Sequence, residues 1–111
     1  VVVLTHSVPE GWEREGEWFT FVTEGGIEAA TETAKRIAGD KDIAVNGGEM
    51  ATQALNAGLL DELWIELVPV LLGGGTPLIL PGFDGAPRSL EGPVDVIEGK
   101  RVTHLRYLVS R

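Results

Sequence analysis

The chain has 111 residues, of which 43% are hydrophobic, so it can form one globular domain with a single core and is too apolar for a disordered segment. Seventeen carboxylates against nine Lys and Arg give a formal charge of −8, which argues against a nucleic-acid surface, because such surfaces need clustered basic residues. The absence of cysteine excludes a disulfide framework, a thiolate nucleophile and a cysteine-based metal site.

Hydropathy gives no sign of a membrane partner. No apolar run approaches the length of a membrane span, and no basic-then-apolar leader is visible. Since the lack of cysteine also fits a reducing compartment, we expect a cytoplasmic protein.

The first third of the chain predicts two strands and a helix. Val1–Thr5 is an apolar, β-branched run typical of a core strand. After a polar loop over residues 6–17, Trp18–Val22 predicts a second strand. A glycine pair at residues 25–26 then opens a helix that runs to about Ala38.

That helix has one apolar stripe and a glycine end. Its apolar positions recur at the spacing of a helix face buried on one side. They are Ile27, Ala30, Ala34 and Ile37. Gly39 is typical of a residue that ends a helix.

A short strand, a second glycine pair and a second helix follow. Asp42–Asn46 predicts a buried strand, and Glu49–Ala57 predicts the helix that leaves it, ended by Gly58. Gly47 and Gly48 lie at the junction, where the lack of a Cβ lets the backbone approach a ligand closely.

Such a junction is a candidate phosphate cradle. The unpaired N–H groups and the positive dipole end of the helix face whatever lies there, and phosphate suits them. The other interpretation is a tight turn that needs glycine only for its positive φ.

The last part of the chain predicts three strands. Glu62–Val68 predicts one, and Pro69 breaks its hydrogen-bond ladder. Gly73–Pro77 predicts a loop. Residues 94–109 predict two antiparallel strands joined at Glu98–Lys100.

The order of these elements predicts an α/β fold. Two successive strand–helix–strand units imply a mainly parallel sheet with right-handed crossovers, followed by antiparallel strands. Parallel sheets bind ligands at the carboxyl ends of their strands. Thr5–His6 and Asn46–Gly47 both lie at such ends, so we expect one shared site.

The remaining polar residues give weaker indications of a catalytic or metal site. Two histidines without matching carboxylate spacing predict no metal site, and no Ser–His–Asp pattern supports acyl transfer. His104 is interpreted as a surface or packing residue. Glu66 interrupts an apolar strand and could hydrogen-bond an amidine-like edge of a pyrimidine or pterin, but the pattern favours an edge-strand residue that points to water.

Several stretches resemble the carboxyl-terminal part of the dihydrofolate-reductase-like fold, and more closely the bacterial deaminase-reductase proteins related to the reductase domain of riboflavin biosynthesis. The matching stretches are Val1–His6, Gly39–Gly48, Ala57–Leu63, Leu67–Leu78 and Val102–Tyr107. The resemblance implies NADPH as cofactor and hydride delivery to a C=N-type carbon of a small-molecule substrate. In the riboflavin relatives that substrate is a ribosylaminopyrimidine, and in the folate relatives it is a pterin.

The resemblance also implies a cofactor site. Thr5 and His6 match the strand end beside the adenosine 2′-phosphate. The glycines at 47 and 48 match the turn against the pyrophosphate and nicotinamide. The remaining matched positions belong to this turn and to the first turn of the helix after it: Asn46, Glu49, Met50 and Gln53. Asn46 replaces a glycine of the folate enzymes, and Glu49 stands where those enzymes carry a base.

Residues 1–111 are therefore expected to form the carboxyl-terminal part of one reductase domain, completed by upstream residues that hold the catalytic groups. Within the chain, Glu66 is the candidate catalytic residue. The apolar stretch Leu67–Leu72 and the last strand suggest a homodimer surface, as in relatives. The alternatives are a dihydrofolate or other pteridine reductase, and a non-catalytic nucleotide-binding or dimerisation module.

Overall fold

The structure is a computed structural model that describes residues 1–12, 18–82 and 87–110. Its chain divides into two compact units, Val1–Asn46 and Gly47–Arg111, and each is described by itself. Neither of the helices in the described residues has the length and apolar character needed to cross a membrane.

The first unit contains a two-stranded parallel sheet and one helix. Strand β1 (Val2–Leu4) pairs in parallel with β2 (Thr20–Val22), in a register that places Val3 opposite Phe21. Helix α1 (Gly26–Ala38) packs against both strands. These strands and this helix begin or end within two residues of the bounds that the sequence predicts.

Glycines set both ends of α1. Gly25 precedes the helix with φ 85°, and the N–H of Gly39 donates to the carbonyl of Lys35 at 3.0 Å. On the predicted apolar stripe Ala30 is buried, but Ile37 at the last turn is 63% exposed. The stripe is therefore covered along its first part and open at its end.

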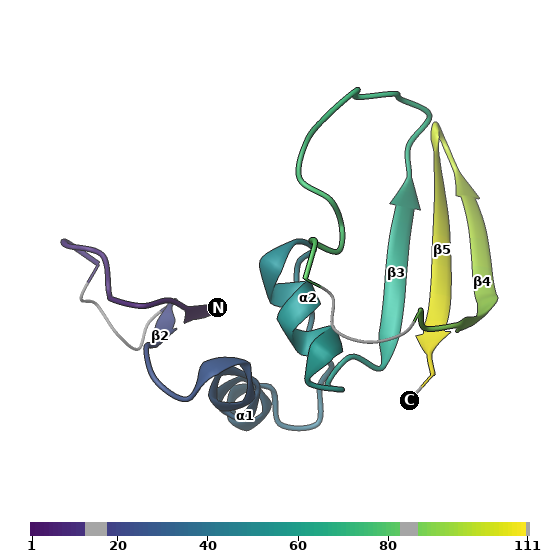
Figure 1. Ribbon diagram of the computed structural model, residues 1–111. Coiled ribbons are helices and arrows are strands. Elements are labelled where there is room, and N and C mark those ends of the chain that lie inside the picture. Colours follow the sequence, from purple (N-terminus) through teal and green to yellow (C-terminus); the bar gives the residue numbers. More distant parts are fainter. Residues whose placement is uncertain (13–17, 83–86, 111) are drawn as a thin grey trace. The chain divides into compact units, whose positions relative to one another are not determined.

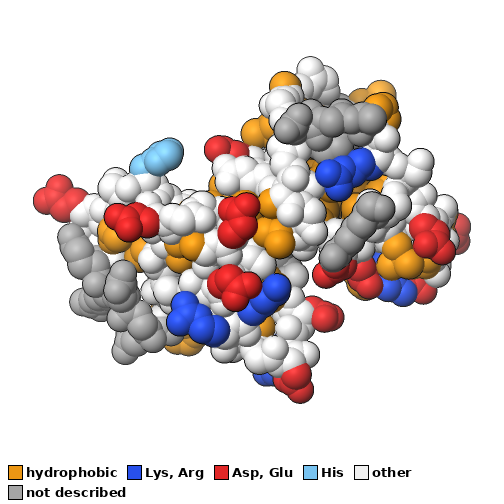
Figure 2. Space-filling model, turned by 60° about the horizontal axis from the view of Figure 1, so that its bottom comes forward, with side chains coloured by type: hydrophobic (Ala, Val, Ile, Leu, Met, Phe, Trp, Pro, Cys, Tyr) orange, Lys and Arg blue, Asp and Glu red, His pale blue; other side chains and the backbone are white. Residues whose placement is uncertain are grey.

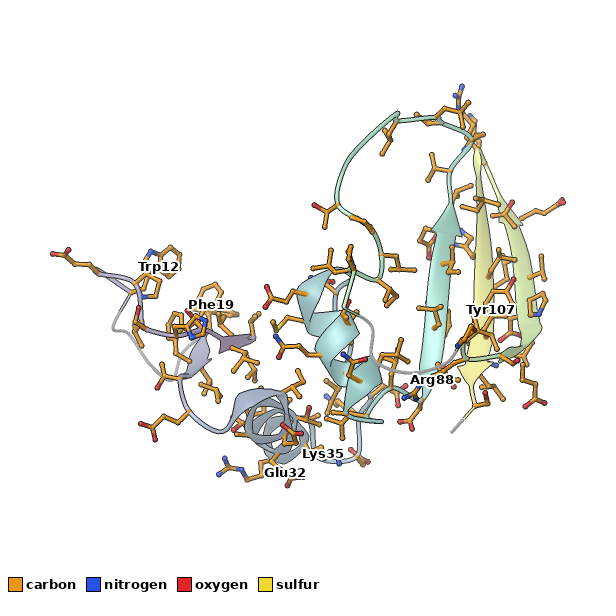
Figure 3. All side chains as sticks on the ribbon, viewed as in Figure 1. Trp12, Phe19, Glu32, Lys35, Arg88 and Tyr107 are labelled. Atoms are coloured by element: carbon orange, nitrogen blue, oxygen red, sulfur yellow. The ribbon has the colours of Figure 1, made fainter. Side chains whose placement is uncertain are left out.

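Aromatic rings gather beside β2. Trp12 meets Phe19 edge-on with ring centroids 5.4 Å apart, and Phe19 stacks on Phe21 at 6.5 Å. Figure 3 labels Trp12 and Phe19 and shows their rings on neighbouring segments. This cluster supplies a small apolar centre to a unit that has only two short strands.

The second unit contains one helix and a three-stranded antiparallel sheet (Figure 1). Helix α2 (Glu49–Asn56) is followed by β3 (Glu62–Leu67), and the chain later forms the hairpin of β4 (Leu90–Gly99) and β5 (Val102–Val109). The strand order is β3-β5-β4, so β5 is central and the other two strands are edges.

Leu55 of α2 lines a cavity of about 190 Å³ together with Leu63 of β3 and Val109 of β5. The helix therefore packs on the sheet face that carries Leu63 and Val109. The opposite face carries Trp64, Glu66 and their partners on β5, because side chains alternate between the two faces of a strand.

The predicted strand Asp42–Asn46 is wrong. These residues pair with no strand among the described residues, and all five are exposed, including Ile43 and Val45. A β-branched apolar run becomes a strand only where a neighbour accepts its N–H and C=O groups, and no such neighbour lies beside it here.

The expectation of a mainly parallel sheet is also wrong for the described residues. Only β1 and β2 pair in parallel, whereas β3 joins β5 antiparallel and so belongs to the carboxyl-terminal strands. The antiparallel carboxyl-terminal strands are confirmed, although β4 begins at Leu90, four residues before the predicted start at Val94. The fold is thus a small α/β arrangement with two separate sheets.

Candidate functional site

The start of α2 is the centre of the predicted site. Gly47 and Gly48 form the bend before the helix, and Gly48 has φ 87° and ψ −140°, a conformation that L side chains rarely adopt. No side chain caps this helix end. The predicted helix start at Glu49 is confirmed, and the glycine at 48 has the positive φ that the tight-turn interpretation requires.

Leu78 covers this bend. The N–H of Gly48 donates to the carbonyl of Leu78 at 2.7 Å, and a Cβ on Gly47 would lie 2.9 Å from Leu78 Cδ1. Gly48 is buried as a result. The close approach that the glycine pair permits is therefore made by the chain's own Leu78, a contact that the sequence pattern did not predict.

The side chain of Thr52, on α2, stabilises the contact between Gly48 and Leu78. Its hydroxyl donates to the carbonyl of Gly48 at 2.8 Å and accepts the N–H of Leu80 at 2.9 Å. The side chain is buried. Sequence reasoning missed Thr52; the available signal was a hydroxyl residue four positions after the second glycine, at the distance where it reaches that glycine's carbonyl.

Three backbone N–H groups at the start of α2 make no hydrogen bond to the described residues. The first N–H of this helix that reaches a carbonyl is that of Thr52, which donates to Gly48 at 3.0 Å. Among the described residues no acceptor is found for the N–H groups of Glu49, Met50 and Ala51. They are the usual unsatisfied donors of a helix N-terminus and can receive an anion's oxygens.

Glu49 brings a negative charge to the same place. Its carboxylate is exposed and accepts a hydrogen bond from Gln53 Nε2 at 3.2 Å. A carboxylate in the first turn stabilises the helix dipole but repels an incoming phosphate. On the face shown in Figure 2, acidic side chains are interleaved with basic and apolar ones.

The other predicted cofactor residues lie in the first unit. Thr5 follows β1, its N–H donates to Val22 at 3.1 Å, and its hydroxyl donates to the carbonyl of Ser7 at 3.1 Å. His6 and Asn46 are exposed. The structure brings together Gly47, Gly48, Glu49, Met50 and Gln53 at one helix start, and it describes Thr5, His6 and Asn46 only within their own unit.

Glu66 lies on the face of the sheet opposite α2, which we call the outer face. It is exposed on the edge strand β3, and its carboxylate pairs with Nδ1 of His104, its cross-strand partner on β5. It lines neither the cavity beside Leu55 nor the one beside Leu67. The interpretation of Glu66 as an edge-strand residue that points to solvent fits this position better than the interpretation as part of a substrate pocket wall.

The same face carries an ion network around Arg106. Its guanidinium donates from Nε to Asp95 at 2.5 Å and from Nη1 to Glu62 at 2.9 Å, and it lies 5.7 Å from the ring centre of Trp64. Trp64 Nε1 also donates to Glu62 at 3.0 Å. The hydrogen bond that Arg106 donates to Asp95 raises the pKa of Arg106, so this cation stays charged and engaged with its own neighbours.

Trp64, Leu67 and Leu71 are not core residues of the second unit. Trp64 is 59% exposed on the outer face, and Leu71 is fully exposed in the segment after β3. After β3 the chain arches away from the sheet and returns beside α2 (Figure 1). The apolar stretch Leu67–Leu72 is therefore a surface feature of the second unit.

Comparison with solved structures gives a likeness that extends over nearly the whole chain. No protein-family model matches the sequence, and no curated protein matches it either. The chain is similar to the crystal structure of a protein of Shewanella sp. PV-4 that is provisionally assigned to riboflavin biosynthesis. The TM-score is 0.65 and the sequence identity is 26% over 99% of this chain and 60% of that chain. The present chain thus spans less than two thirds of that neighbour.

Proposed function

We propose that this chain is part of an NADPH-dependent reductase that delivers hydride to a C=N-type carbon of a ribosylaminopyrimidine-like substrate, such as 5-amino-6-(5-phosphoribosylamino)uracil. The observation that carries the proposal is the likeness to the Shewanella riboflavin-biosynthesis structure over 99% of the chain. The start of α2 supports it in part, because the backbone N–H groups of Glu49, Met50 and Ala51 can bind phosphate oxygens.

The donors at this helix start fit a dinucleotide in part. The N–H groups of Glu49, Met50 and Ala51 point out of an uncapped helix end and can bind phosphate oxygens. Gly48 N–H is engaged with Leu78, and the carboxylate of Glu49 opposes an anion. The fit at this helix start therefore rests on backbone donors and on the helix dipole, with no Lys or Arg among the matched cofactor residues.

NADPH would supply the hydride, and the residues of this chain would hold and orient it. The helix start would bind the diphosphate, and on the resemblance alone we propose Thr5 and His6 as contacts of the adenosine phosphate. Such binding fixes the nicotinamide relative to the substrate, which is the main contribution a protein makes to cofactor chemistry. No catalytic side chain is assigned to the described residues.

The 111 residues are proposed to be one part of a longer domain. This is supported by the 60% coverage of the neighbour and by the exposed, unpaired segment 42–46, which has the composition of a strand. Circular dichroism and thermal melting of residues 1–111 alone test this idea. A cooperative, stable unit that binds NADPH would contradict it.

Titration with NADPH and NADH, followed by nicotinamide fluorescence, tests the cofactor assignment in the intact protein that contains these residues. Glu49→Lys should tighten NADPH binding several-fold, because it replaces a repelling charge with an attracting one. Glu28→Lys is the matched control, since Glu28 is the exposed acid in the first turn of α1.

Equal effects of the two substitutions would show a general charge effect and would remove the start of α2 from the site. Turnover of the ribosylaminopyrimidine, measured by NADPH absorbance and by mass spectrometry of the product, tests the reaction itself. Reduction of dihydrofolate in its place would support the pteridine alternative.

A dimerisation role is the second candidate, and one observation favours it. The stretch Leu67–Leu72 exposes Leu71 and Leu72 almost completely, which is unusual for a monomer surface. We propose that this stretch contributes to a homodimer interface. A protein that dimerises but binds no dinucleotide would be a structural module that kept the fold without the chemistry.

A further inference from the structure

We infer that two copies of this chain associate by reciprocal insertion, in which Leu71 and Leu72 of each copy fill a groove at the β4–β5 turn of the other. The inference deepens the dimerisation role proposed above and rests on it, because it names the surface that receives the apolar stretch. It does not depend on the binding of NADPH.

The receiving surface is a groove of about 440 Å³ between the end of β3 and the β4–β5 turn, which we call the hairpin groove. The cross-strand pairing of Leu67 with Thr103 places the end of β3 beside that turn (Figure 1). Leu67, Val68 and Pro69 line the groove from the end of β3 and the residues after it, and Val102 and Thr103 line it from β5. A mainly apolar groove of this size is typical of a binding site.

The inserted group is a pair of leucines that the chain holds in solvent. Leu71 is 100% exposed and Leu72 is 82% exposed, so neither rests in the groove of its own copy. Just before them, the N–H of Val70 donates to the carbonyl of Val68 at 2.8 Å and closes a tight turn around Pro69. Adjacent leucines exposed to this extent, beside other exposed apolar residues, mark an interaction surface.

Charge favours a second copy of the chain as the partner. The formal charge is −8, yet no charged residue occurs from Leu67 to Gly82. Two acidic copies repel each other over most of their surface, so they can associate only through a stretch that carries little charge. A basic partner would be attracted to the acidic surface instead of to this uncharged stretch.

The rim of the hairpin groove carries one charge of each sign. Glu98 and Arg101 both line the groove, both are exposed, and neither makes an ion pair with another described residue. Arg101 has φ 62°, a conformation that is uncommon for arginine, so the turn keeps this cation at some cost in backbone strain.

These two charges complement each other across a two-fold axis. Such an axis repeats every contact, so Glu98 of each copy pairs with Arg101 of the other when the leucines are exchanged. The leucines supply the apolar area of the interface, and the charges on the rim fix the register of the two copies.

Complementary charge reversals test this pairing in the intact protein that contains these residues. Glu98→Arg alone and Arg101→Glu alone place like charges on facing rims, so each should raise the dimer dissociation constant roughly tenfold or more. An equimolar mixture of the two variants restores opposite charges on both rims and should form mixed dimers. Native mass spectrometry distinguishes the mixed dimer from either parent by its mass.

The matched controls are Glu28→Arg and Arg36→Glu, which make the same changes at exposed positions on α1 and should leave the dissociation constant unchanged. If the wild-type protein is a monomer, the dimerisation role and the inference both fail. If it is a dimer but either single reversal associates as tightly, or the mixture stays monomeric, the inference fails and the dimerisation role stands. NADPH titration of the same variants reports separately on the reductase proposal.

A photoreactive amino acid in place of Leu72 locates the inserted side chain. In a mixture of unlabelled and isotope-labelled protein, we expect mixed-isotope crosslinks from this position to residues 98–103 of the other copy. The same probe in place of Ile37, which is exposed on α1, should give no crosslink between copies. Crosslinks from position 72 that stay within one copy, or that reach another region, would overturn the inference even for a dimeric protein.

Discussion

The hydroxyl oxygen of Thr52 accepts a hydrogen bond from the backbone N–H of Leu80, 28 positions further along the chain. The same hydroxyl donates to the carbonyl of Gly48, so one buried side chain joins the glycine bend, the helix and the chain at Leu80. The first two predictions below follow from this junction.

Thr52→Val should destabilise the second unit by about 1–3 kcal/mol, because the N–H of Leu80 and the carbonyl of Gly48 lose their common partner in a buried place. Urea unfolding measures the free energy of unfolding. Thr31→Val is the control, since the Thr31 hydroxyl donates to the carbonyl of Ile27 on α1 at 2.8 Å and accepts no second partner among the described residues. Thr52→Ser keeps the hydroxyl and should recover most of the loss.

Gly48→Ala should cost about 1–3 kcal/mol through backbone strain, because the residue has φ 87°. Space is not the reason, since the added Cβ would lie 3.7 Å from Thr76 Cγ2, an ordinary contact. Gly74→Ala adds a Cβ in open space at a position without positive φ and should change stability by less than about 0.5 kcal/mol. Equal losses in both variants would refute the strain argument.

Asp95→Asn should lower the melting temperature slightly, and less in high salt, because its pair with Arg106 is exposed and screened. Asp95 raises the pKa of Arg106 above its unfolded value. A group whose pKa is raised on folding stabilises the folded state fully at any pH below its pKa in the unfolded chain. That stabilisation is lost only as the pH rises through its pKa in the folded protein. For Arg106 that loss lies beyond the ordinary alkaline range.

The effect of Asp95→Asn on melting should therefore be the same at neutral pH and at about pH 10, well below the pKa of an arginine. Melting curves at the two pH values make the comparison. An effect that vanishes between them would mean that another titrating group carries the interaction.

Leu71→Glu should prevent self-association if the stretch Leu67–Leu72 is a dimer surface, because it places a charge in an apolar contact. Sedimentation velocity over a range of concentrations measures the oligomeric state. Ile37→Glu introduces the same charge at an exposed apolar position on α1 and should leave association unchanged. A monomeric wild-type protein at all concentrations would contradict the dimer proposal directly.

The sequence by itself determined both helices of this protein and the places where they end. A helix satisfies its hydrogen bonds within one segment, so apolar spacing and the glycines at 39 and 58 are sufficient local signals. The hairpin of β4 and β5 was also predicted from local signals, because its two strands are joined by a short turn. The presence of β1, β2 and β3 was also visible as short apolar runs.

Only the tertiary structure decided how those strands pair and what covers the glycine bend. Asp42–Asn46 has the composition of a strand but remains unpaired, because a strand needs a neighbour that composition does not reveal. Leu78 reaches Gly48 across 30 positions, and Glu66 meets His104 across 38. Contacts between residues so distant along the chain depend on packing, which no local pattern encodes.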